Sequence, residues 1–172
     1  MKNSKLSCAV MALAFLTLLA VPSMPYLKME ILREYLGTNT LNALELVEQM
    51  YILHGMPGST NLFGHEHYEL ITLMLMIMGI VLIVLPVLLE GISMVLILNA
   101  RTKGRRKAGI CFSVLTVLFL AACLAVFLSA GRFVGVTTRA GYGLYTALGS
   151  SVLFALAAVW NGRKQRNQNK KH

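Results

Sequence analysis

The sequence predicts an all-α polytopic membrane protein with four transmembrane helices and a small helical cap on the extracytoplasmic side. Of its residues, 56% are hydrophobic and 13% are charged, whereas a soluble domain carries about 25% charged residues. The second observation is the separation of the charges. The chain contains no Asp, and its Glu residues gather in one segment, between Glu30 and Glu69, with Glu90 as the exception. The basic residues cluster in three other places: Lys2 and Lys5, Arg101–Lys107 and Arg163–Lys171.

The positions of the basic clusters predict the topology of the chain. Cytoplasmic loops of membrane proteins collect Lys and Arg. We therefore expect both termini on the cytoplasmic side of a bacterial-type plasma membrane, with the acidic segment outside. A basic chain can also bind nucleic acid, but these Lys and Arg flank apolar spans. Anionic lipid of the inner leaflet is the partner that they indicate, and no nucleic acid is expected.

Four apolar stretches, at about 6–24, 70–99, 108–129 and 140–160, are long enough to cross the hydrocarbon core, which takes about 20 residues. The first could instead be a secretory signal, since Lys2 and Lys5 precede it and small residues end it. Its apolar run, about 18 residues, is long for such a signal and favours a retained helix. The second stretch is about 43 Å long as a helix. We expect its surplus, Leu70–Met78, to pack against the cap.

The cap is the segment 25–68, the only part of the chain with a soluble character. Apolar residues at helical spacing predict one short helix over Tyr26–Leu36. A second is expected over Leu41–Leu53, with Thr40 as its N-cap. Residues 1–160 are therefore predicted to form one membrane domain that includes the cap. Residues 161–172 are predicted to be a basic, disordered cytoplasmic tail.

Small residues recur at every fourth position in the third and fourth spans, where they would let helix backbones approach closely. The two series predict a tight hairpin of these spans, against which the first two spans pack more loosely. In the third span the series is Gly109, Ser113, Val117, Ala121, Ala125 and Ser129, and in the fourth it is Gly143, Ala147, Ser151 and Ala155.

Glu90 is the intramembrane residue that most strongly indicates a function. It precedes Arg101 by about 16 Å of helix, which places it near the middle of the bilayer. A carboxylate at that depth is paired, protonated or facing a cavity, because its desolvation is costly. Two interpretations stay open: a proton or cation relay, and a protonated side chain that hydrogen-bonds a neighbouring helix.

His54, His65 and His67 are weak candidates for metal ligands. His-x-His with an intervening Glu offers suitable ligand types, but the sequence indicates no fixed third ligand. The pattern is also not the H-E-x-x-H of a zinc protease. We therefore expect neither a metal site nor any other cofactor.

No catalytic motif is present, and a non-enzymatic function is expected. The chain lacks C-x-x-C, G-x-S-x-G and Gly-rich phosphate-binding patterns, and without Asp it cannot form a paired-aspartate site. Its layout is similar to that of claudin-type four-span proteins, but their outer Trp and paired Cys have no counterpart between positions 25 and 68. We expect a structural or accessory subunit that binds another membrane protein, or a homo-oligomer, through the cap and the long second span. The alternative is a small transporter or ion-conducting oligomer that uses Glu90.

Overall fold

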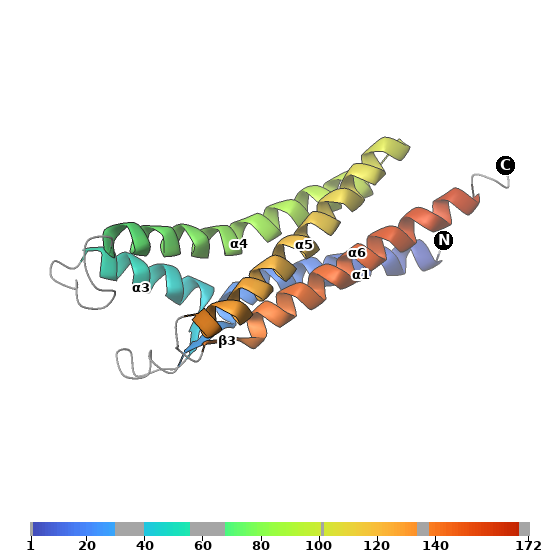
Figure 1. Ribbon diagram of the computed structural model, residues 1–172. Helices are drawn as coiled ribbons and strands as arrows, with labels where there is room; N and C mark the ends of the chain where they lie inside the picture. The colour runs from blue at the N-terminus through green and yellow to red at the C-terminus, as the bar shows by residue number, and fades with distance from the viewer. Residues whose placement is uncertain (1, 30–39, 56–67, 101, 134–137, 169–172) are drawn as a thin grey trace.

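The computed structural model describes residues 2–29, 40–55, 68–100, 102–133 and 138–168 (Figure 1). Four long helices dominate it: α1 (Lys2–Ala20), α4 (Tyr68–Leu98), α5 (Lys103–Phe133) and α6 (Tyr142–Gln168). Each contains a segment long and apolar enough to cross a membrane: Lys5–Ser23, Met76–Leu98, Lys103–Val126 and Tyr142–Asn161. The predicted four-span, all-α class is therefore confirmed, and the chain is a multi-pass membrane protein by the length and composition of its helices.

The three basic segments of the sequence lie at the same end of the bundle. In Figure 1 the start of α1, the α4–α5 connection and the end of α6 lie at one end. The basic clusters of the sequence belong to these three segments. The remaining described elements lie at the opposite end, which we call the sheet end; the first is the terminus end.

The helices pack in the order α1, α6, α5, α4, so that α4 and α6 lie diagonally in the bundle. The most extensive contacts are between α1 and α6 and between α4 and α5. The predicted hairpin of the third and fourth spans, α5 and α6, is thus not the most extensive contact of the bundle. Gly109 of α5 lies against α4, and Gly143 of α6 lies against Met24 and Pro25. These glycines allow close approaches, but to other elements than predicted.

A three-stranded antiparallel sheet joins the connections at the sheet end. Its order is β2 (Thr40–Asn42), β1 (Pro25–Met29) and β3 (Thr138–Ala140). The Cα of Leu27 lies opposite both Leu41 and Ala140. The sheet thus ties the segment after α1 to the connection between α5 and α6.

The expected helix over Tyr26–Leu36 is wrong at its start, and residues 30–39 lie outside the described part of the chain. Residues 25–29 instead form a strand that pairs with β2 on one side and β3 on the other. A 3₁₀ turn, η1 (Val21–Ser23), with Pro22 in its first positions, connects α1 to this strand. Pairing of β1 with β3, distant in sequence, overrides the local helical pattern.

The second cap helix is present as α3 (Ala43–Gly55), two residues later than predicted. Asn42, and not Thr40, caps it. The Asn42 Oδ1 accepts a hydrogen bond from the Glu45 N–H at 2.7 Å, and the Glu45 carboxylate accepts one from the Asn42 N–H at 2.9 Å. This reciprocal pair is a capping box, which satisfies two backbone donors at once.

The last helix extends beyond the predicted fourth span. α6 continues to Gln168, so the tail that we expected to be disordered from residue 161 begins as helix. After Trp160 the sequence contains no Pro and a single Gly, Gly162. The Lys, Arg and Gln residues that follow have high helix propensity, so the helix can continue. Residues 169–172 lie outside the described part of the chain.

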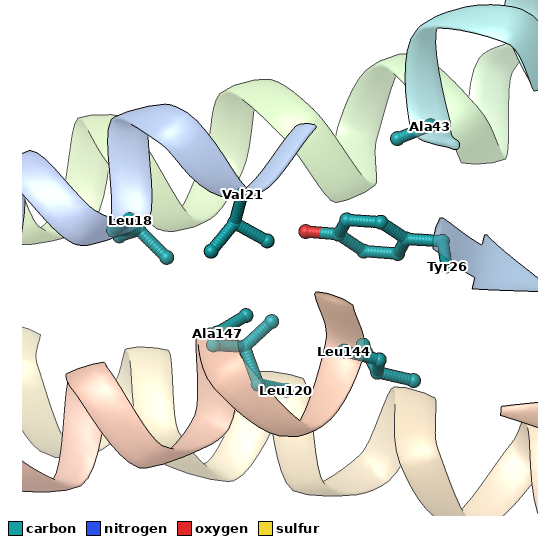
Figure 2. Packing of buried hydrophobic residues seen from close by; sticks show 7 residues of the cluster. All are labelled: Leu18, Val21, Tyr26, Ala43, Leu120, Leu144 and Ala147. Carbon is teal, nitrogen blue, oxygen red and sulfur yellow. The ribbon is translucent and has the colours of Figure 1, made fainter. Parts of the chain in front are cut away.

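Two separate apolar clusters form the core of the bundle. The sheet-end cluster contains Leu18, Val21, Tyr26, Ala43, Leu120, Leu144 and Ala147. Figure 2 shows the Tyr26 ring pointing from β1 toward Val21, with Ala43 above it and Leu144 below. The terminus-end cluster contains Met11, Ala14, Ile97, Phe154, Ala157 and Ala158.

Candidate functional site

Buried polar side chains separate the two apolar clusters. We call Glu90, Ser113, Thr116 and Ser151 the polar layer; all four have 0% of their surface exposed. On each helix that contributes to the layer, the residues before and after it belong to different apolar clusters. On α4, Glu90 lies between Val87, which packs on the sheet-end cluster, and Ile97 of the terminus-end cluster.

The residues that flank the polar layer on α5 and α6 also belong to different clusters. On α5, Ser113 and Thr116 lie between Ile110, on the terminus-end side, and Leu120, on the sheet-end side. On α6, Ser151 follows Ala147 of one cluster and precedes Phe154 of the other. The polar layer therefore crosses the bundle between the two halves of its core.

A hydrogen bond between α4 and α5 fixes their register at the polar layer. The Ser93 hydroxyl donates to the Gly109 carbonyl at 2.7 Å. A Cβ on Gly109 would lie 3.0 Å from the Ser93 carbonyl oxygen, so no larger residue fits without displacement. One turn further toward the sheet end, α4 carries Glu90 and α5 carries Ser113. The antiparallel register thus brings these two residues to the same depth.

Glu90 and Ser151 are the polar residues of the layer that lack a partner. Both carboxyl oxygens of Glu90 and the hydroxyl of Ser151 are buried and make no hydrogen bond to any described residue. The Ser151 hydroxyl nevertheless lies close enough to act on the Glu90 carboxyl. The two groups belong to α4 and α6, which lie diagonally in the bundle.

The other hydroxyls of the layer are bonded within their own helices. Ser113 donates to the Ile110 carbonyl at 2.9 Å, and Thr116 donates to the Phe112 carbonyl at 3.1 Å. A hydroxyl that has donated its hydrogen still offers lone pairs to another donor. The layer therefore has spare acceptors around Glu90 and few donors, an arrangement that suits a neutral, protonated carboxyl. An ionised one would cost about 2.5–3.5 kcal/mol at mid-bilayer.

The small residues of the predicted packing series divide into buried and exposed sets. Gly109, Ser113, Gly143, Ala147 and Ser151 are buried, Ala155 is half-buried, and Ala121 and Ala125 are exposed. Four residues turn an α-helix by more than a full turn, so a series at every fourth position drifts by about 40° per step. The buried face of α5 instead continues through Thr116 and Leu120. The predicted α5 series thus leaves the core after Ser113.

The histidines do not form a described site. His54 lies in α3, whereas His65 and His67 fall outside the described residues. Within the described ranges, no group of three His, Cys, Asp or Glu side chains comes together as a metal site.

An open apolar groove of about 380 Å³ lies between α3 and the sheet-end half of α4. Among its lining residues, Glu48 is the charged one. Several lining side chains are well exposed, with 70% for Tyr51, 55% for Leu44 and 43% for Ile80. The lining comprises Leu44, Val47, Glu48, Tyr51, Met76, Ile80, Ile83 and Val84.

The groove lies along the sheet-end part of the long second span. α4 has 31 residues, about 46 Å of helix, which exceeds the hydrocarbon thickness of about 30 Å. In Figure 1, α4 separates from α6 toward the sheet end, and α3 lies against it there. α3 therefore contacts α4 as expected, but the groove residues of α4 lie within the candidate span Met76–Leu98 and mostly beyond the predicted Leu70–Met78.

Tyr26 is a buried residue whose role the sequence did not indicate. It lies among apolar side chains at the sheet end, and burial raises the pKa of its phenol to about 12. The Gly141 N–H donates to the Tyr26 carbonyl at 2.8 Å, so this residue also links β1 to the start of α6. The signal in the sequence would have been an isolated aromatic residue directly after Pro25.

No known protein family, curated protein or solved structure matches this chain.

Proposed function

We propose that the protein is a non-enzymatic accessory subunit that binds another membrane protein through the groove between α3 and α4. The observation that carries the proposal is this groove, because exposed apolar side chains line it on a helix of the cap as well as on a span. Lipid solvates apolar residues within the span. Tyr51 and Leu44 belong to α3, outside the four candidate spans, and apolar surface of that kind indicates an interaction site.

Site-specific photo-crosslinking in native membranes tests this proposal. A crosslinker at Ile80 lies in the groove, and one at Ile92 on the same helix lies outside it with a nearly equal exposure, 44% against 43%. We expect one discrete protein adduct from Ile80 and from Tyr51, and lipid adducts alone from Ile92. The same adducts from Ile80 and Ile92, or lipid alone from all three positions, would reject a protein partner at the groove.

The orientation in the membrane is part of the same proposal. The basic clusters support a cytoplasmic location for the terminus end and an extracytoplasmic one for α3 and the sheet, in a bacterial-type plasma membrane. A reporter inserted within residues 56–67 should be active on the opposite side from one fused after Lys171. Reporters active on one side would overturn the topology.

Anionic lipid is the second partner that we propose, at the terminus end. Lys103, Arg105 and Lys107 are exposed at the start of α5. Each such residue attracts an anionic leaflet by about 1 kcal/mol. We expect higher thermal stability in nanodiscs with anionic lipid than in neutral ones, and the difference should shrink as salt is added. Equal stability in the two lipids would contradict this.

The alternative function, transport of a proton or cation through Glu90, has one supporting observation, the unpartnered carboxyl at mid-span. The apolar clusters on both sides of the layer support the accessory function instead, since in the described part of the chain they place apolar side chains between the layer and each end of the bundle. Flux in proteoliposomes compares the two. Proton or cation flux that Glu90→Gln abolishes would favour transport, and flux that it leaves unchanged would remove that hypothesis.

A further inference from the structure

We propose that Glu90 and Ser151 form a buried proton-binding site, in which a neutral carboxyl bonded to the Ser151 hydroxyl ties α4 to α6 across the bundle. The proposal is independent of the partner-binding function. It rests on three buried oxygens that have no partner among the described residues: both Glu90 Oε atoms and Ser151 Oγ.

The behaviour of Ser151 differs from that of its neighbours. Ser150, one residue earlier, donates to the Ala147 carbonyl of its own helix at 2.9 Å. Ser113 and Thr116 also donate within their helix. The Ser151 hydroxyl makes no such bond and lies beside the Glu90 carboxyl. It is therefore free to donate to one carboxyl oxygen.

The second carboxyl oxygen requires a proton of its own. No described donor reaches it, and the oxygens that share its depth on α5 have already given their hydrogens to carbonyls. A proton on this oxygen can be donated to one of their lone pairs. One bound proton thus satisfies all three unpartnered oxygens, and an ionised carboxylate leaves a buried charge without a counterion.

Among the described residues, the groups around Glu90 offer no charge to balance a carboxylate. On α1, Phe15 packs on the adjacent residue of α4, with its ring 3.7 Å from a Cβ built on Gly91. On α5 the residues at this depth are hydroxyls, and Cys111 near them is exposed. Cys8 belongs to the terminus-end part of α1, and Cys123 lies near Tyr26 at the sheet end. The nearest basic residue of the described α5, Lys107, is exposed at its terminus end.

A bond between Glu90 and Ser151 would link two helices that lie diagonally in the bundle. These two helices are not adjacent in the bundle, so a bond between Glu90 and Ser151 runs through its centre. Loss of the proton would remove the hydrogen bond that the carboxyl itself donates and place a charge between the two apolar clusters, although Ser151 could still donate to the carboxylate. The folded protein then holds one proton that the unfolded chain releases, so stability falls as pH rises.

Infrared spectroscopy of the full-length protein in nanodiscs tests the proton directly. Near neutral pH we expect a carbonyl stretch from a protonated carboxyl that disappears in Glu90→Gln and shifts in Ser151→Ala. Ser150→Ala is the matched control, since it removes a neighbouring buried hydroxyl with a partner in its own helix, and should leave the band in place. Absence of the band in the unaltered protein, which needs no variant to fold, would overturn the proposal. A band that Ser151→Ala does not move would do the same.

Thermal unfolding between pH 5 and pH 9 provides the second measurement. The unaltered protein should lose roughly 5–10 °C in midpoint across this range, whereas Glu90→Gln, which stays neutral, should lose much less. Equal losses in both proteins would contradict the site. Sodium is the competing ligand: stabilisation by Na⁺ at high pH that Glu90→Gln removes would replace the proton with a cation.

Discussion

Gly109→Ala tests whether close packing of α4 on α5 sets the register of the polar layer. The new Cβ would lie 2.7 Å from Cγ1 of Ile97 and 3.0 Å from the Ser93 carbonyl oxygen. Carbon atoms in good contact are about 3.5–4.0 Å apart. The first distance is therefore short by about 1 Å. Cγ1 is an inner atom of the Ile97 side chain, so relief requires α4 and α5 to move apart.

The expected net cost of this substitution is about 1–2 kcal/mol. Overpacking of this kind costs about 1–3 kcal/mol. Separation of the helices would also weaken the Ser93–Gly109 hydrogen bond of 2.7 Å, worth about 0.6 kcal/mol in a membrane. Against these, Ala is favoured over Gly in a helix by about 1 kcal/mol. The steric term is thus larger than the gain in helix propensity.

Reversible unfolding in mixed micelles measures this change against a matched control, Gly149→Ala on α6. A Cβ on Gly149 meets no atom within 4 Å. This control should be neutral or stabilised, because it keeps the propensity gain without the clash. A Gly109→Ala protein as stable as the Gly149→Ala protein would show that α4 and α5 do not depend on this close approach.

Three further outcomes are expected. Gly141→Ala should destabilise the sheet end more than Gly109→Ala destabilises the α4–α5 pair, since the new Cβ would clash with the Pro25 carbonyl oxygen; unfolding in micelles compares the two variants. Tyr26→Phe should remove a loss of stability of about 2–3 kcal/mol between pH 10 and pH 12, because the unfolded tyrosine ionises near 10.0 and the buried one near 12. Asn42→Ala should weaken α3 by about 1 kcal/mol through loss of the capping box, seen as faster amide exchange in that helix.

Each of these outcomes has a matched control. Gly104→Ala, where a Cβ meets nothing within 4 Å, should leave the sheet end unchanged. Tyr145→Phe, at an exposed position of α6, should keep the loss of stability at high pH. For the cap, Thr40→Ala removes the residue that the sequence indicated as N-cap. Exchange in α3 that responds to Thr40→Ala and not to Asn42→Ala would contradict the observed capping box.

The number and positions of the spans could be predicted because apolar length is a local property. The ends of the helices could not be predicted in this way. α5 begins at Lys103 and α6 continues to Gln168, because the polar residues at these ends also favour helix. Tyr26 illustrates a different failure. Its local pattern fits a helix, but pairing with residues 138–140 makes it part of a strand. Such long-range pairing leaves no periodic signal within a short segment.

Residue composition and the lengths of the apolar stretches were enough to predict a membrane protein with four spans and to place Glu90 deep in one of them. These predictions follow from transfer of apolar and charged residues between water and lipid, which depends on composition and length. Which helices contact each other is known from the three-dimensional fold alone, because apolar contact does not discriminate between neighbours in lipid. The fold also placed Ser151 beside Glu90 and α3 against α4. Both depend on helix rotation and register, which small differences in packing fix and which no single span encodes.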